Sequence, residues 1–117
     1  MLEKIQRALE EFELPVFYGL VPDGEELETW DYYVFNRAEM EKAGSSVNYK
    51  QYYQVHVICE NYVPEDEVMK IIQKIGEIPG MNVADKPITY DYTAKGNTDL
   101  VVEMATITFV RPVRGCL

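Results

Sequence analysis

The most reactive side chains in this sequence are the imidazole of His56 and the thiol of Cys59. Such a pair supports nucleophilic catalysis when the imidazole lies within hydrogen-bonding distance of the thiol. Both belong to residues 49–60, whose alternating pattern is typical of a β-strand, and alternate residues of a strand point to opposite faces. We therefore expect them to point apart, with a structural or surface role for His56 and a small hydrophobic role for Cys59.

Carboxylates are the other abundant reactive groups, with 20 acidic residues against 11 basic ones and a formal net charge of −9. Their abundance in so acidic a chain indicates a solvated surface more than a pair of general acids. The sequence has no calcium-binding loop, phosphate-binding glycine loop or Cys/His spacing of a metal site. We therefore expect no catalytic residue, no metal and no cofactor, and we expect that the protein is not an enzyme.

Charge and cysteine content also limit the partners and the compartment. A net charge of −9 repels phosphate backbones, which disfavours sequence-specific nucleic-acid binding and docking on anionic membranes. Cys59 and Cys116 are too few for a disulfide framework, which favours a reducing cytoplasm. Because the first residues are amphipathic, we expect neither a signal peptide nor a membrane span.

The segments that must position these residues begin with a helix. Apolar residues recur at helical spacing from Leu2 to Phe12 and predict about three helical turns. Pro15 ends this helix, and residues 15–22 predict an extended segment, either an edge strand or a packed connection. Aromatic and branched residues then predict the first main strand over residues 30–36.

A long hairpin is expected to join that strand to the strand over residues 49–60. The connecting residues 37–47 are polar, and a loop of that length is uncommon unless it is functional or disordered. Two interpretations stay open for this hairpin tip, a contact element and a solvated loop. The first half of the second strand is polar on both faces, so we expect it to project from the core as a tyrosine-rich ribbon.

The second half of the chain predicts another helix and two more strands. Pro64 and the carboxylates after it indicate a helix start, and Gly76 indicates its end. The buried stripe of this helix is expected at Val68, Ile71, Ile72 and Ile75. Alternation predicts strands near residues 88–93 and 100–110, the last one closed by Pro112.

The order α-β-β-α-β-β predicts one α+β domain over residues 1–117. Its sheet should be antiparallel or mixed, with both helices on one face and a projecting β-hairpin over about residues 36–49. That hairpin is the best candidate for a protein interface, because tyrosine combines a large rigid contact area with a polar tip. The candidate interface residues are Arg37, Met40, Glu41, Lys42, Tyr49 and Tyr52.

Tyr49 and Tyr52 carry most of this prediction, because they lie near the hairpin tip on opposite faces. There the core of the domain is expected to cover them least. The alternative is that the tyrosines line the core between the sheet and the helices and its rim.

Several segments, taken in order, resemble the tail-completion proteins of long-tailed phages and prophages. They are the LPVFYG segment at residues 14–19, the strand over 30–35, the alternation over 53–57, the helix over 64–75 and the final strand over 105–109. This family includes tail terminators and head-to-tail joining proteins. The resemblance implies an α/β fold with a sheet packed on two helices, and a hexameric ring that caps the tail tube.

The resemblance also implies the partners and the location. The partners would be further copies of the chain, the tail tube protein and the head connector or neck protein. The ring would lie in the virion tail or neck, after assembly in the cytoplasm of the bacterial host, and DNA would pass through it without being read. A lumen lined with carboxylates would repel that DNA, whereas a positively charged lumen would contradict this hypothesis.

Other functions remain open at this point. One is a small α+β domain that binds a ligand or dimerises as a regulatory domain, because this layout hosts many unrelated functions. Within the phage interpretation, the chain could instead be a neck component or a minor tail or capsid component. A concave apolar pocket would favour ligand binding, and a flat tyrosine-rich surface would favour assembly.

Overall fold

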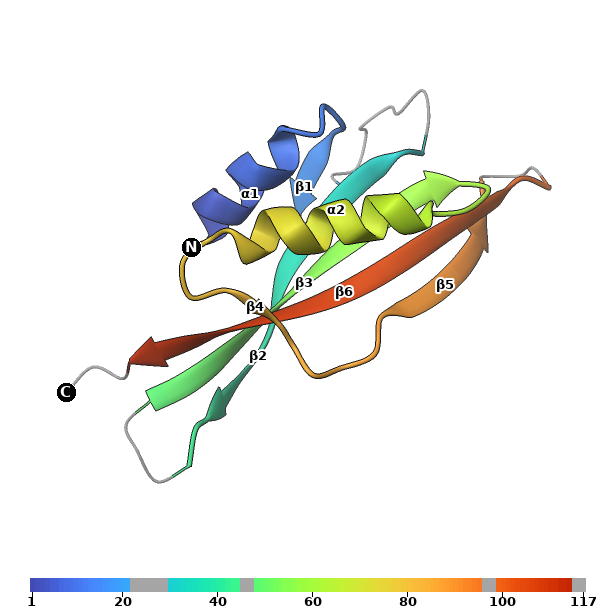
Figure 1. The fold of residues 1–117 in the computed structure, drawn as a ribbon. Coiled ribbons are helices and arrows are strands. Elements are labelled where there is room, and N and C mark those ends of the chain that lie inside the picture. Colours follow the sequence, from blue (N-terminus) through green and yellow to red (C-terminus); the bar gives the residue numbers. More distant parts are fainter. Residues whose placement is uncertain (22–29, 45–47, 96–98, 115–117) are drawn as a thin grey trace.

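The computed structural model describes residues 1–21, 30–44, 48–95 and 99–114 (Figure 1). The elements, in chain order, are α1 (Leu2–Glu10), β1 (Val16–Tyr18), β2 (Tyr32–Lys42), β3 (Asn48–Glu60), α2 (Glu65–Gly76), β4 (Asn82–Val83), β5 (Thr89–Ala94) and β6 (Val101–Arg114). The predicted α+β class is confirmed, and the short strands β1 and β4 add to the predicted order.

The six strands form one mixed sheet in the order β1-β2-β3-β6-β4, and β5 also pairs with β6. β1 runs parallel to β2, and all other pairs are antiparallel. The extended segment predicted after Pro15 is therefore an edge strand. β3 is central, because it pairs with β2 on one side and with β6 along its whole length on the other.

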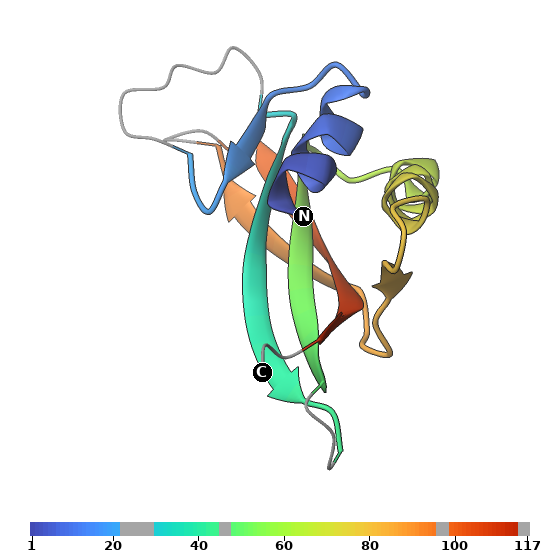
Figure 2. The same cartoon turned by 90° about the vertical axis from the view of Figure 1, so that its left-hand side faces the viewer.

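Both helices cover the same face of the sheet, as Figure 2 shows. The apolar stripes of α1 and α2 form one core with alternate residues of β3. The buried residues of this core in α1, β3 and α2 include Ile5, Leu9, Val55, Val57, Val68, Ile71 and Ile75. Cys59 lies on the same side of β3 and is also buried, as predicted, whereas Ile72 of the expected stripe is only partly buried.

The predicted hairpin tip is wrong in its extent, because β2 continues as a strand to Lys42. Arg37 pairs with Tyr53 and residues 40–42 pair with residues 49–51 of β3, so only residues 43–47 connect the two strands. Burial in β2 ends at Asn36, and the remaining residues are exposed. A strand without a buried face tolerates polar side chains, so polarity there is compatible with pairing.

The prediction that Pro112 closes the last strand is also wrong. β6 continues to Arg114, and Pro112 pairs with Lys50 of β3. Val110 is the last residue of β6 that pairs with β4 on the other side. Proline is accepted at an edge position, where its missing N–H would face outward.

The far ends of β2, β3 and β6 form a three-stranded ribbon that extends beyond both helices (Figures 1 and 2). We call the outer part of this ribbon the arm, formed by residues 40–42, 48–51 and 111–114. The arm makes the molecule long, with extents of 52 × 27 × 23 Å. The radius of gyration is 15.4 Å, against about 13 Å for a compact domain of similar length.

Candidate interaction surface

A β-bulge marks the base of the arm. The register of β2 against β3 shifts between Arg37 and Met40, so that two residues lie opposite Tyr52. Gln51, only 6% exposed, donates from Nε2 to the backbone oxygen of Glu39 and to that of Tyr52, both at 2.9 Å. One buried amide therefore satisfies two carbonyl groups beside the irregular part of the ladder and fixes the bulge.

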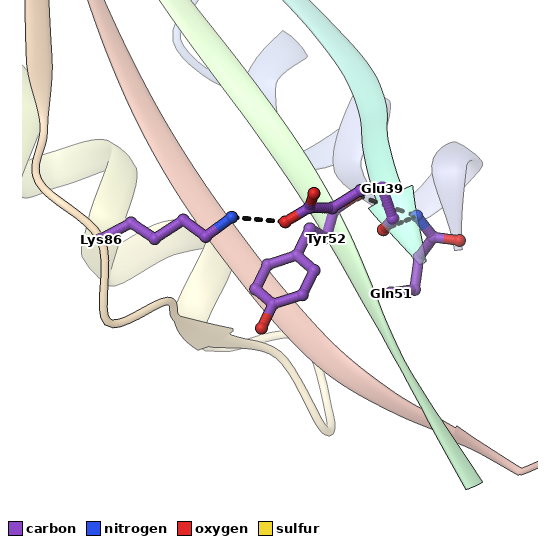
Figure 3. A network of polar contacts seen from close by, with 4 residues as sticks. All are labelled: Glu39, Gln51, Tyr52 and Lys86. Atoms are coloured by element: carbon purple, nitrogen blue, oxygen red, sulfur yellow. Dashed lines mark hydrogen bonds and ion pairs between the residues drawn. The ribbon is translucent and has the colours of Figure 1, made fainter. Parts of the chain in front are cut away.

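Lys86, from a different part of the chain, contacts Glu39 and Tyr52 at this bulge (Figure 3). Lys86, between β4 and β5, has its Nζ 2.5 Å from Oε1 of Glu39 and 4.4 Å from the centroid of the Tyr52 ring. The hydrogen bond to Glu39 raises the pKa of Lys86, so its ammonium group stays charged above the aromatic ring. This contact joins the connection before β5 to β2 and β3.

Tyr52 is therefore 9% exposed, and the prediction that its own domain leaves it uncovered is wrong. Lys86, 34 positions later in the chain, covers part of the Tyr52 ring through the cation–π contact. Tyr49, on the opposite face and nearer the end of the arm, is half-buried.

An open groove of about 500 Å³ lies between the start of α1 and the helix-facing side of the arm. Two rows of register partners cross this side, Met40–Gln51–Arg111 and Lys42–Tyr49–Val113. The residues that line the groove are Met1, Leu2, Glu3, Arg37, Met40, Gln51, Tyr53, Arg111 and Val113. α1 does not extend over the arm, which leaves the groove open (Figure 1).

The groove is cationic although the chain is acidic. Among the described residues, neither Arg37 nor Arg111 has a carboxylate oxygen within 4.0 Å. Burial raises the pKa of the Tyr53 hydroxyl, and the positive charges of Arg111 and Arg37 oppose that rise. Both guanidinium groups therefore act on Tyr53. Glu3 contributes one exposed carboxylate at the edge. The groove therefore favours a partner that carries negative charge.

The structure brings together two of the predicted interface residues, Arg37 and Met40, which line the groove. Glu41 and Lys42 are exposed on the arm itself. Arg111 and Val113 also line the groove and are not predicted from the sequence, because Pro112 is typical of a strand end. A signal for them was present, since they continue the alternation of the buried residues Ile107 and Phe109.

His56 lies on the face of the sheet away from the helices and links three strands. Its Nε2 is 2.7 Å from Oδ1 of Asn36 on β2, and its Nδ1 is 2.8 Å from Oγ1 of Thr106 on β6. Because the amide oxygen can only accept, Nε2 carries the hydrogen and donates it. Burial lowers the pKa of His56, although Asp91 opposes this effect, so the ring is held neutral. This arrangement gives His56 a structural role.

Cys59 is buried in an environment that suppresses thiol reactivity. Burial raises the pKa of its thiol to about 11, and the charges of Asp31, Glu67 and Glu103 act in the same direction. Glu67 also accepts a hydrogen bond from the hydroxyl of Tyr33, whose pKa is raised by burial and by that carboxylate. A thiol in this setting stays protonated and packs as an apolar side chain.

A smaller pocket of about 160 Å³ lies on the face of the sheet that carries His56. It is lined by Trp30, Tyr32, Ile58, Asp91, Tyr92, Thr93, Val102 and Met104. Pockets that hold small-molecule ligands usually measure about 300–1,000 Å³. This pocket is too small to favour the ligand-binding alternative.

Comparisons with known proteins do not assign the chain to a family. No protein-family model matches the chain, and no curated protein matches it in sequence. Neither helix in the described part of the chain has the length and apolar character needed to cross a membrane. Within residues 1–21, 30–44, 48–95 and 99–114, no group of three His, Cys, Asp or Glu side chains is placed to hold a metal ion.

Proposed function

We propose that the protein is a structural assembly protein that completes the tail of a long-tailed phage or prophage. It would cap the tail tube as a hexameric ring and join the tube to the head connector. The observation that carries the proposal is the arm, which projects beyond both helices (Figure 1) and carries Met40, 56% exposed, together with the half-buried Tyr49 and Val113. Apolar side chains on a projecting ribbon become buried only when another molecule covers them.

The order of segments that resembles the tail-completion proteins supports this class of assembly over others. The net charge of −9 fits a ring through which DNA passes without being held. The partners are then further copies of the chain, the tail tube protein and the connector or neck protein. The site of action is the virion tail or neck, after assembly in the cytoplasm of the bacterial host.

A variant with a shortened arm tests this proposal. Glu41 and Lys50 are register partners, so a two-residue Asn-Gly turn can replace residues 42–49 and close the hairpin there. The replacement keeps Gln51, Tyr52 and Lys86 in place. The replacement also removes Tyr49 and Asn48, the strand partners of Val113 and Arg114, so the outer end of the groove loses its support. We therefore expect native mass spectrometry and electron microscopy to show six-membered rings for the wild type, and mainly a folded monomer for the variant. Rings formed equally well by the variant would contradict a role for the arm.

The ligand-binding alternative depends on the groove, which is larger than the pocket on the face of the sheet that carries His56. Its volume of about 500 Å³ would hold a small molecule, but binding sites of this kind bury most of the ligand surface. An open groove with two arginines suits a charged protein segment better. The position of the protein in assembled particles, viewed by electron microscopy of labelled virions, would separate a tail terminator from a neck or minor tail or capsid component.

A further inference from the structure

The groove lies at one end of the long axis, and a surface of opposite charge lies at the other end. β3 runs between them for 13 residues, which span about 40 Å. α2 begins beside the far end of β3, away from the arm (Figure 1). The first turn of α2 carries Glu65, Asp66 and Glu67. The molecule therefore separates its cationic groove from an anionic surface.

The carboxylates of Glu65 and Asp66 are available for a partner. Both residues are exposed, and no Lys, Arg or His nitrogen of the described residues lies within 4.0 Å of either carboxylate. Glu67 differs, because it is half-buried and accepts the hydrogen bond from Tyr33. Two of the three carboxylates in this turn therefore face solvent without a counter-charge from the described part of the chain.

Apolar side chains flank these two carboxylates. Tyr62, just before α2, is 67% exposed, and Met69, one turn after Glu65 on the same side of the helix, is 60% exposed. We call Tyr62, Glu65, Asp66 and Met69 the acidic end. It combines negative charge with exposed apolar area, as the groove combines Arg37 and Arg111 with Met40 and Val113.

We propose that the groove of one copy binds the acidic end of a second copy. This inference rests on the proposed function, because it names the two surfaces through which the ring closes. Glu65 and Asp66 would pair with Arg37 and Arg111, since guanidinium groups bind carboxylates through charge-assisted hydrogen bonds. Exposed methionines and the Tyr62 ring would supply the apolar part of the contact.

The positions of the two surfaces determine the kind of assembly. A contact between two different surfaces of the same chain is heterologous, so each copy that binds one neighbour keeps its other surface free for the next. Such contacts repeat head to tail until the chain of copies closes into a ring or grows as a filament. A self-complementary dimer would instead use the same surface on both copies.

Complementary charge reversals test the inference. One variant carries Arg37→Glu and Arg111→Glu in the groove, and the other carries Glu65→Lys and Asp66→Lys in the acidic end. Each variant alone presents like charges to itself, so we expect its self-association to weaken by about 100-fold or more. An equimolar mixture presents opposite charges at every contact, so it should recover the wild-type mass by sedimentation velocity and native mass spectrometry. Recovery would also show that both variants are folded.

A matched control places the same change of charge outside the groove, the arm and the acidic end. Lys4→Glu with Arg7→Glu alters two exposed cations of α1 that do not line the groove. We expect this variant to associate as the wild type does.

Three results would overturn the inference or its basis. If the groove and acidic-end variants each keep the wild-type mass, the protein self-associates, but not through these two surfaces. If the mixture of the two variants stays monomeric, the surfaces do not contact each other. If the wild-type protein itself is monomeric at every concentration, the proposed ring function fails as well.

Discussion

Tyr52 shows how a single cation changes the role of an aromatic side chain. Its ring lies under the ammonium group of Lys86 and is 9% exposed, so it contributes to the stability of the monomer. We predict that Tyr52→Ala lowers the free energy of unfolding by about 3 kcal/mol, because a buried ring is lost and a cavity remains. Tyr49→Ala should cost less than about 1 kcal/mol, because Tyr49 is only half-buried.

Urea denaturation of the two tyrosine variants and the wild type measures this difference. Tyr52→Phe serves as the control, since it keeps the ring that Lys86 covers. Equal losses of stability for Tyr52→Ala and Tyr49→Ala would mean that Tyr52 is not part of the folded core.

His56 predicts a pH dependence of stability. Its folded-state pKa lies below the ordinary value, so the unfolded chain binds the proton first as the pH falls. The free energy of unfolding should therefore be highest above about pH 6.5 and decrease as the pH falls toward 5.5, by at most about 1.4 kcal/mol per pH unit. The chain has one histidine, so His56→Gln should remove most of this slope.

The measurement is urea denaturation of the wild type and His56→Gln at several values between pH 5.5 and 7. An increase in wild-type stability toward pH 5.5 would show that the folded state favours the charged imidazole, against the neutral form that its hydrogen bonds to Asn36 and Thr106 support.

Cys59 predicts a slow reaction with thiol reagents. With its pKa near 11, the thiolate fraction at pH 8 is roughly 100-fold below that of an ordinary cysteine. In a Cys116→Ser variant, Cys59 is the only remaining thiol. We expect maleimide labelling of the native variant to be at least about 100-fold slower than labelling of the same variant unfolded in urea. Equal rates would contradict the burial of Cys59.

At the scale of elements, the bulge between β2 and β3 depends on one buried amide. We predict that Gln51→Leu lowers the free energy of unfolding by about 1–3 kcal/mol, because the backbone oxygens of Glu39 and Tyr52 lose a donor. Amide hydrogen exchange in residues 39–42 should also become faster, since the bulge would no longer be fixed.

Lys50→Leu is the matched control for this substitution, because Lys50 is the exposed neighbour of Gln51 on the same strand. It should leave both stability and exchange close to those of the wild type. If Gln51→Leu behaves as this control does, the amide does not hold the bulge.

The sequence predicted the elements whose pattern is local. Alternation in β3 and the apolar stripe of α2 correctly placed the core, and Cys59 fell inside it. The extent of β2 was missed because its outer residues bury no face, so pairing with β3 leaves no periodic signal. The cover over Tyr52 was missed because Lys86 reaches it through the fold and not through spacing.

The candidate groove was predictable only in part for the same reason. Arg37 and Met40 are predicted by their place near the hairpin, whereas Arg111 joins them across β3 through strand pairing. Proline at position 112 is a strong local signal for the end of a strand, but an edge position removes its cost. Which strands lie beside each other is a property of the whole sheet, and no local pattern reports it.

At the scale of the whole molecule, the separation of charge along the long axis makes association sensitive to salt. The Debye length falls from about 10 Å at 0.1 M to about 3 Å at 1 M ionic strength, which screens contacts between exposed charges. If Arg37 and Arg111 meet Glu65 and Asp66 of a neighbour, the dissociation constant should rise about tenfold or more between these ionic strengths. Sedimentation velocity over a concentration series measures it.

The mixture of charge-reversed variants should respond to salt as the wild type does, because its contacts carry the same number of opposite charges. A contact dominated by apolar area, such as Met40 against Tyr62 and Met69, would instead hold or strengthen as salt increases. The sign of the salt effect therefore decides which part of the two surfaces drives assembly. Association that does not weaken with salt would show that the charge pairs do not drive the proposed contact, even if the arm proves necessary for the ring.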